Sequence, residues 1–415
     1  MPDLLDAAPV RATALVDAGP GNTVIVLHRE DQIFDLGRFN LQNVHRFRAV
    51  PTEHLRGLAW PEILESEDVR LDRGVVECRQ VRLFGGVEED PVLSPGLIRH
   101  TSTVDCFFDP CPNAASESFV DVDARINNTI STFIGRRLLA RLDQTLEIPP
   151  LPAAAQRILA LKTNPDYSLK ELVKVVETDP SIAARVMSWA CSAFYAASPP
   201  PKSLSDSIMR VLGFDLVMNM ALGLALAGSL RLPAEHVRGA PPFWTEAVYT
   251  AAAMEALARR GDSEARAATG MSYLTGLLAN YGTLVIGHVF PPQYALICQL
   301  QEANPHLPTW VLDEHVLKLS REVLAARLLD QWDLPESSTL AIRHQHTVDY
   351  QGEAEREVRL LQTARSLLGY TSAGLESAQD ARLKPMGLAT EDLEAVGSLL
   401  VESRDALDGL VRAVA

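Results

Sequence analysis

The chain has 415 residues, of which 47% are hydrophobic and 22% are charged. A chain of this length is too long to fold around a single hydrophobic core, and these proportions of hydrophobic and charged residues are typical of globular proteins. We therefore expect two or three domains with a sizeable interior. The formal net charge of -15 repels phosphate backbones, and the basic residues form only short groups such as Arg136 with Arg137. Nucleic acid is therefore not an expected partner.

The five cysteines are odd in number and scattered, and they form neither a Cys-x-x-Cys pair nor a zinc-type spacing with histidine. Cys106 and Cys111 are close in sequence, but two small loop residues explain them better than a redox couple or a metal half-site. No signal peptide or membrane helix is expected, and residues 217–230 indicate a buried helix instead. A reducing cytoplasm fits these features.

Turn formers and short β-branched runs fill the first part of the chain, whereas nearly everything after Val120 has the pattern of helices. Strand-like runs occupy residues 23–27, 46–50 and 74–83, and a short helix is expected within residues 53–64. This shift predicts a small α/β or α+β domain over residues 1–122. The domain contains no lysine, because the first in the chain is Lys162, so Schiff-base chemistry is excluded there.

Residues 123–145 are expected to form a connector, because apolar side chains recur at three- and four-residue spacing over residues 126–142. Helix start signals follow: Ser168 with Glu171 forms a capping box, and Asp179 precedes a proline in the first turn of the next helix. Further helices are predicted over residues 247–258, 273–289, 315–332, 337–344, 355–368 and 391–414. The last of these belongs to a C-terminal helical extension over residues 376–415.

A series of short motifs runs through this helical half. They are IPPLP at 148–152, ELV at 171–173, DPSIAARV at 179–186, SDSIMRVLG at 205–213, TGLLANYG at 275–282, DQWDLP at 330–335 and AIRHQH at 341–346. In this order and spacing they resemble the HDOD family. The resemblance covers residues 146 to about 370, which sets the predicted domain at 146–375. It departs from the family at Cys191, where asparagine usually precedes the serine.

The resemblance implies an all-α fold related to the HD phosphohydrolases, whose catalytic members hold divalent metals through a histidine, an adjacent His-Asp pair and a later aspartate. HDOD proteins generally lack that set and occur in bacterial signalling. In this chain Glu246 takes the approximate place of the first histidine, and Ala279 and Asn280 replace the His-Asp pair. Arg365 falls near the final aspartate, and its permanently charged guanidinium would repel a divalent cation. We therefore expect no metal, no cofactor and no catalytic residue.

His344 and His346 are the remaining candidates. Residues two apart on a helix point about 200° away from each other, so joint chelation would need a frayed helix end. One structural and one exposed histidine is the favoured interpretation. We also predict that Arg365 pairs with Glu246 or reaches into the pocket, giving an ion pair at the place of the metals. The predicted site, called the remnant pocket below, consists of Glu246, Ala279, Asn280, His344, His346 and Arg365.

The N-terminal domain carries a second resemblance. Residues 13–36 are similar to the early strands of the YbaK-type aminoacyl-tRNA deacylases, which can precede an HDOD domain in bacterial proteins. That family uses a lysine near its first strand and a Gly-Pro substrate loop, whereas this domain lacks lysine and residues 85–91 fit the loop poorly. The resemblance thus implies a shortened, inactive version, and an unrelated α/β interaction domain explains the same residues equally well.

Two functional hypotheses follow. The first is a non-catalytic bacterial signal-transduction protein whose HDOD domain binds a protein partner or a small signalling ligand, with homodimerisation through apolar helix surfaces left open. The alternative is a metal-dependent phosphohydrolase acting on nucleotides or cyclic dinucleotides, with ligands drawn from Glu246, Asn280 and the two histidines. The ligand count argues against it, because activating water for attack on phosphate needs a firmly held metal.

Overall fold

The computed structural model describes residues 8–17, 23–43, 46–50, 59–65, 68–84, 91–98, 102–104, 108–111, 151–162, 168–195, 198–228, 230, 233, 235–348, 350–370, 383 and 386–414. The chain forms two compact units. The sheet unit comprises Met1–Glu117, Glu235–Ala240 and Pro292–Lys318, and the helical unit comprises Ser118–Ala234, Pro241–Pro291 and Leu319–Ala415. The predicted fold class, a small domain of mixed structure followed by a helical HD-like domain, is confirmed.

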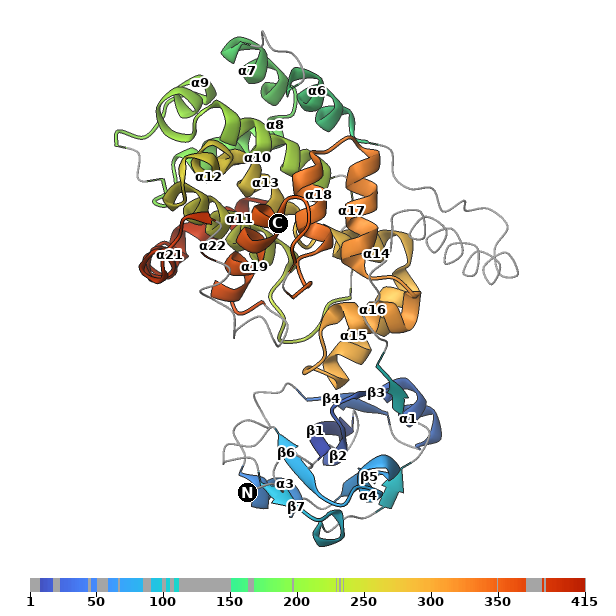
Figure 1. Cartoon of the computed structure of the whole chain (residues 1–415). Coiled ribbons are helices and arrows are strands. Elements are labelled where there is room, and N and C mark those ends of the chain that lie inside the picture. The colour runs from blue at the N-terminus through green and yellow to red at the C-terminus, as the bar shows by residue number, and fades with distance from the viewer. Residues whose placement is uncertain are drawn as a thin grey trace, which may run out of the picture. The chain divides into compact units, whose positions relative to one another are not determined.

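The sheet unit is built on a mixed seven-stranded sheet (Figure 1). Its strands are β1 (Ala8–Asp17), β2 (Thr23–Arg29), β4 (Phe47–Ala49), β5 (Val69–Asp72), β6 (Val81–Phe84), β7 (Val92–Leu93) and β8 (Ser102–Val104). They follow the order β7-β6-β1-β2-β5-β8, with β4 also paired to β1. The pairs β1–β2, β1–β4 and β6–β7 are antiparallel, whereas β1–β6, β2–β5 and β5–β8 are parallel. A second sheet pairs β3 (Gln32–Phe34) with β9 (Phe108–Pro110).

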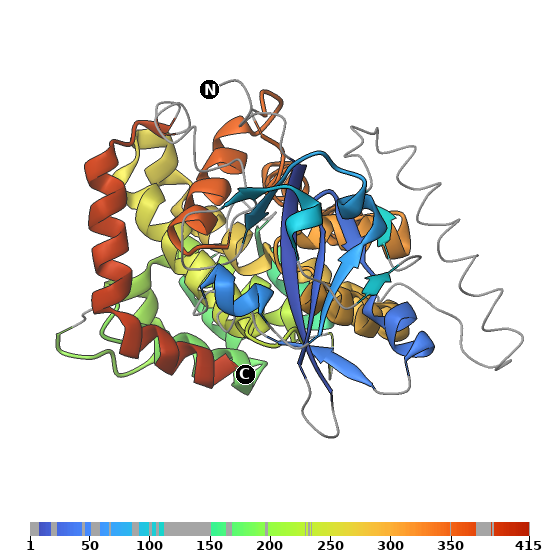
Figure 2. The ribbon, with the colours of Figure 1, turned by 90° about the horizontal axis from the view of Figure 1, so that it is seen from below.

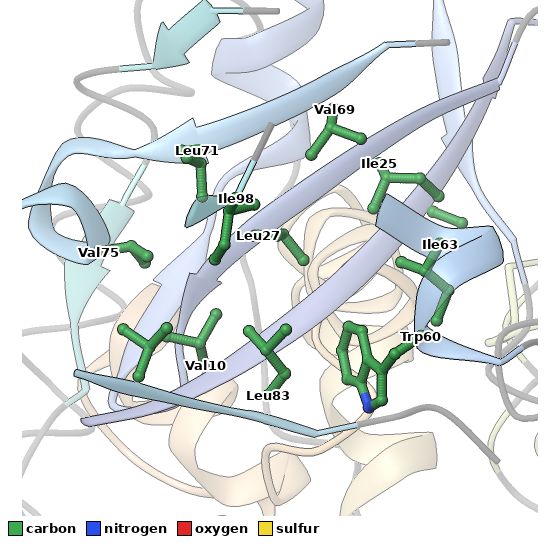
Figure 3. Packing of buried hydrophobic residues seen from close by; sticks show 12 residues of the cluster. Val10, Ile25, Leu27, Trp60, Ile63, Val69, Leu71, Val75, Leu83 and Ile98 are labelled. Atoms are coloured by element: carbon green, nitrogen blue, oxygen red, sulfur yellow. The ribbon is translucent and has the colours of Figure 1, made fainter. Parts of the chain in front are cut away.

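Strand β2 explains why this sheet is buried on both faces. Side chains alternate between the two faces of a strand, so Ile25 and Leu27 lie on one face and Val24 and Val26 on the other. The first pair packs with Trp60 and its neighbours (Figure 3). A strand covered on both faces needs a continuous apolar run instead of an alternating one, which is what residues 23–27 provide.

The second face of the sheet is covered in part by a segment from far along the chain. Its cluster includes residues of α1 (Leu36–Gln42) and Ala303, the last residue of α15 (Pro291–Ala303). Thr13 donates a hydrogen bond from its Oγ1 to the carbonyl oxygen of Ala303 at 3.0 Å. The Ala303 carbonyl and side chain therefore both contact the sheet.

Asn304 joins this segment to β3. Its Oδ1 accepts a hydrogen bond from the Phe34 backbone nitrogen at 2.8 Å, and its Nδ2 donates to the Phe34 carbonyl at 2.9 Å. Asn304 is fully buried, so both backbone groups of Phe34 depend on this side chain in place of water. Pro292–Lys318, including α16 (Thr309–Leu317), accordingly groups with the sheet unit, and the domain boundaries drawn from the sequence remain a prediction.

The helical unit contains no strand among the residues described. Its helices are α6 (Ala153–Lys162), α7 (Leu169–Glu177), α8 (Pro180–Ala190), α9 (Leu204–Ser207), η2 (Ile208–Leu212), α10 (Phe214–Ala227), α11 (Phe243–Arg260), α12 (Ser263–Ala267), α13 (Thr269–Leu278), α14 (Tyr281–Val289), α17 (Arg321–Gln331), α18 (Glu336–Arg343), α19 (Glu355–Leu367), α21 (Thr390–Glu402) and α22 (Arg404–Val414). Helix α11 contacts α13, α19, α21 and α22. The last two helices, red in Figure 2, follow one another at an angle.

The helix caps predicted at Ser168 and Asp179 are confirmed. Ser168 accepts from the Glu171 nitrogen in a capping box, and Asp179 accepts from two backbone nitrogens at the start of α8. Every residue from 216 to 227 is buried in α10, as expected for a buried helix. No single helix in the described part of the chain is long and apolar enough to cross a membrane, although the bent pair α9–η2 and α10 passes that test together.

Several predicted element bounds are wrong. Residues 273–289 form two helices that break at Ala279 and Asn280, and residues 391–414 also form two. The helix predicted over residues 315–332 is interrupted at Lys318, which adopts a left-handed conformation with φ of 64°. Residues 74–83 were expected to be a strand but begin in the short helix α4 (Arg73–Val76) before β6. The connector helix predicted over residues 126–142 lies outside the described residues.

Two histidines, the buried His28 and the half-buried His306, make the sheet unit sensitive to acid. The His28 ring lies 5.6 Å from the His306 ring, and His28 Nε2 lies 3.0 Å from Thr13 Oγ1. Burial lowers the pKa of His28 to about 3, with His306 adding to the effect. Burial, followed by the charge of Arg11, lowers the pKa of His306 to about 4.

Acid should therefore destabilise this unit. Below the ordinary histidine pKa the unfolded chain binds protons that the folded chain does not, so stability is full above that pKa and falls as pH drops toward the folded values. Between pH ~6 and ~4.5 the free energy of unfolding should fall by about 1.4 kcal/mol per pH unit for each histidine. His306→Gln should remove about half of this slope, measured by hydrogen exchange of β1 and β2 peptides. His236→Gln, at an exposed histidine, is the control. Equal dependence of the unfolding free energy on pH in the two variants would contradict the role given to His306.

Candidate functional site

The residues of the remnant pocket come from four elements of the helical unit. Glu246 lies in the first turn of α11, and Ala279 and Asn280 form the break between α13 and α14. The two histidines follow α18, and Arg365 lies in the last turn of α19. Because α11 and α18 each pack against both α13 and α19, the break and the ends of these helices are held within one packed group.

Glu246 and Arg365 form the predicted ion pair. Arg365 Nη1 lies 2.8 Å from Glu246 Oε1, and Arg365 Nη2 donates to the Tyr370 carbonyl at 3.2 Å. The side chains are only 11% exposed for Arg365 and 21% exposed for Glu246, so solvent screens the pair weakly. Burial raises the pKa of Tyr370 to about 12, and the nearby Glu246 carboxylate adds to the shift. A cation thus already neutralises the carboxylate at this position.

The break between α13 and α14 is held by amide side chains. Asn280 Nδ2 donates to the carbonyl of Phe243, one turn before Glu246, at 3.1 Å. The Ala279 carbonyl accepts from Gln345 Nε2 at 3.0 Å. Asn280 Oδ1 and Gln345 Oε1 are buried and have no hydrogen-bond partner in the described structure, and the same is true of Arg365 Nε. The break therefore presents amide groups to its surroundings and supplies neither imidazole nor carboxylate.

The two histidines bind different partners. The His344 ring stacks on Tyr350 with 4.4 Å between ring centroids, and burial, helped by the charge of Arg343, lowers its pKa to about 4. His346 Nε2 lies 3.3 Å from Glu322 Oε1 on α17. Both histidines are half-buried, so the expectation of one exposed histidine is wrong. The reason is that α18 ends at Arg343, which lets the chain turn each ring toward a separate packed neighbour.

Two glutamines that the sequence reasoning missed organise this region. Gln345 lies between the histidines, is 2% exposed and bonds to Ala279. Gln362 on α19 donates from its Nε2 to the carbonyls of Thr347 at 2.9 Å and His344 at 3.3 Å. The only sequence signal was the position of Gln345 between the two candidate histidines.

Among the described residues, no group of three or more His, Cys, Asp or Glu side chains could hold a metal ion.

A second buried acid lies elsewhere on α11. Glu255 follows Glu246 by nine residues, which places the two carboxylates on opposite sides of the helix. It accepts a hydrogen bond from the Tyr195 hydroxyl at 2.8 Å and pairs with Arg259 at 2.6 Å. Burial raises the pKa of Glu255, with Arg259 opposing the shift. Because Tyr195 and Arg259 satisfy this carboxylate, we assign it a role in packing.

Comparisons of the sequence and the structure with known proteins identify relatives of this chain. The HDOD domain model matches residues 148–348. A crystal structure of a candidate signal transduction protein from Marinobacter aquaeolei VT8 is 32% identical, with a TM-score of 0.83, and the match covers 99% of this chain and 94% of that one. The chain belongs to the HDOD family.

Matches of lower identity include a solved structure, which shows the fold alone, and a curated sequence. An HDOD domain protein of unknown function from Geobacter sulfurreducens is 20% identical with a TM-score of 0.54, over 70% of this chain and 99% of that one. An uncharacterized protein of Treponema pallidum (strain Nichols) is 25% identical over 225 residues, which is 54% of this chain. The match spans 42% of that curated relative's length. The resemblance of the N-terminal domain to YbaK-type deacylases stays a prediction.

The ion pair of Glu246 with Arg365 should be measurable as a coupling free energy between the two side chains. Glu246→Gln and Arg365→Met should each lower the free energy of unfolding by about 1–3 kcal/mol, because each leaves a weakly solvated charged or polar partner behind. The double variant should lose less than the sum of the two. The exposed pair Asp206 and Arg210, at 24% and 42% exposure, is the matched control and should couple by less than about 1 kcal/mol. Equal coupling in the two pairs, measured by urea unfolding, would count against a special role for Arg365.

Proposed function

We propose that this protein is a non-catalytic regulatory protein of bacterial signal transduction, whose HDOD domain binds a small ligand or a protein partner. Membership of the HDOD family and the full-length similarity to the Marinobacter protein support the regulatory role. The observation that carries the non-catalytic part is the ion pair of Arg365 with Glu246. A guanidinium cannot lose its proton in a protein, so its charge stays at the pocket at every physiological pH.

The other residues of the remnant pocket offer few ligands for a metal and no strong base to activate water. Asn280 offers a neutral amide oxygen, and Ala279 offers only its carbonyl, which already accepts from Gln345. His344, with a pKa near 4, is a weak base at neutral pH. His346 is engaged by Glu322. Hydrolysis of a phosphodiester would need a firmly held metal or a strong general base.

The same residues suit recognition better than catalysis. Among the described residues, Asn280 Oδ1 and Gln345 Oε1 are buried acceptors without partners, and Arg365 Nε is a buried donor without one. An unsatisfied buried polar atom costs about 1–3 kcal/mol, so a partner or ligand that reaches these atoms would recover that cost. Because the Glu246 and Arg365 side chains are themselves mostly buried, binding there would act on the ion pair. Breaking or tightening this pair is the event we propose to couple to signalling.

Metal content is the direct test of the non-catalytic assignment. The full-length protein, purified without chelators from cells grown with added manganese, iron and zinc, should contain no stoichiometric metal by mass spectrometry of the elements. It should also fail to hydrolyse bis(p-nitrophenyl) phosphate above the rate of Glu246→Ala, which removes the acidic candidate ligand. Stoichiometric metal, or hydrolysis that Glu246→Ala abolishes, would establish the phosphohydrolase instead.

A further inference from the structure

The sheet unit contains a cavity of about 510 Å³ that the remnant pocket does not involve. It is formed by α1, β4, α15 and the short segment that carries Arg238. Ligand pockets in proteins usually have volumes of about 300–1,000 Å³, so this cavity is large enough for a small organic molecule. Its lining combines residues of the N-terminal sequence with residues from the HDOD region.

Two arginines in this cavity have no ion-pair partner among the described residues. Along β4, Phe47 and Ala49 are buried in the core, whereas Arg48 between them is exposed. Arg46 precedes Arg48 by two residues, and both line the cavity. In an extended chain, residues two apart lie on the same side. The two guanidinium groups are therefore presented together.

Asn40 fixes the backbone that carries these arginines. Its Nδ2 donates to the Phe47 carbonyl at 2.8 Å, and its Oδ1 accepts from the Phe47 nitrogen at 2.7 Å. Both backbone groups of the residue between Arg46 and Arg48 are thus held by one side chain of α1. A binding group on a fixed backbone loses less freedom when a ligand binds, so this frame favours affinity.

The cavity also contains a third arginine, which is already neutralised. Arg238 makes two side-chain hydrogen bonds to Glu302, at 3.0 and 2.7 Å, and its backbone nitrogen makes a third at 3.0 Å. Glu302 is only 11% exposed. Three guanidinium groups against one carboxylate leave an excess positive charge in this cavity, although the chain carries a formal net charge of -15.

Apolar side chains also line the cavity, beside the polar Asn40 and Gln299. Leu36 and Phe47 contribute buried side chains, and Leu41 is 88% exposed at the lining, which is unusual for a leucine. We infer that this cavity binds a small organic phosphate, a phosphate monoester attached to an apolar group. A phosphate monoester carries close to two negative charges at neutral pH and offers three acceptor oxygens. It therefore matches Arg46 and Arg48, which have no ion-pair partner in the described part of the chain, better than a singly charged carboxylate does.

Naphthyl phosphate is a suitable probe, titrated into the full-length protein by calorimetry at low salt. We expect saturable binding that is tighter than that of inorganic phosphate, naphthoate or naphthol, each of which lacks one of the features that the cavity recognises. Arg46→Gln with Arg48→Gln should weaken the binding about tenfold or more, equivalent to about 1.4 kcal/mol. Arg79→Gln, an exposed arginine of the same unit outside the cavity, should leave it unchanged.

A second variant shifts the affinity in the opposite direction. Glu302→Gln removes the one carboxylate and frees Arg238, so it should tighten binding of naphthyl phosphate severalfold. Absence of saturable binding, binding of naphthoate or naphthol as tight as that of naphthyl phosphate, or equal affinity in the wild type and the double arginine variant would each overturn the proposal. The function proposed for the remnant pocket is unaffected by these outcomes, because that pocket lies in the helical unit.

Discussion

The charge balance around Glu246 is the constraint on which the functional account depends. The sequence resemblance implies that catalytic HD phosphohydrolases gather negative and neutral ligands around a divalent cation in this region. Here the cation is part of the chain: Arg365 reaches Glu246 at 2.8 Å from a helix more than a hundred residues away. A covalently attached cation cannot be removed by a chelator or exchanged for a metal. We therefore propose that this pocket keeps its electrostatic balance without a metal ion, the Lewis acid that hydrolysis would require.

Amide side chains surround this ion pair and position the backbone near it. Gln345 and Asn280 hold the break between α13 and α14 through hydrogen bonds to backbone carbonyls, and Gln362 ties the segment after α18 to α19. In these bonds neutral side chains position the backbone of the pocket. The result is a packed polar region with a few unsatisfied atoms, which is suited to recognising another molecule and poorly suited to activating water.

The sequence predicted those features that depend on near neighbours or on a single substitution. The capping residues Ser168 and Asp179 act within one helical turn, and the pairing of Arg365 with Glu246 followed from opposite charges placed at equivalent positions of a known fold. It could not reveal Asn304, because a side chain that bonds a strand 270 residues earlier leaves no periodic signal. The break at Ala279 was hidden for a related reason. The flanking helices are buried on most sides, so the apolar pattern continues on both sides of Asn280 and gives no sign of the change of direction.

Restoring the metal ligands tests the central claim most directly. One variant would carry Glu246→His, Ala279→His and Asn280→Asp and keep Arg365, and a second would add Arg365→Asp. Titration with manganese, followed by calorimetry, should show no binding to the wild type, little to the first variant and stoichiometric binding to the second. Manganese binding to the wild type, or equal binding to both variants, would contradict the view that Arg365 excludes the metal.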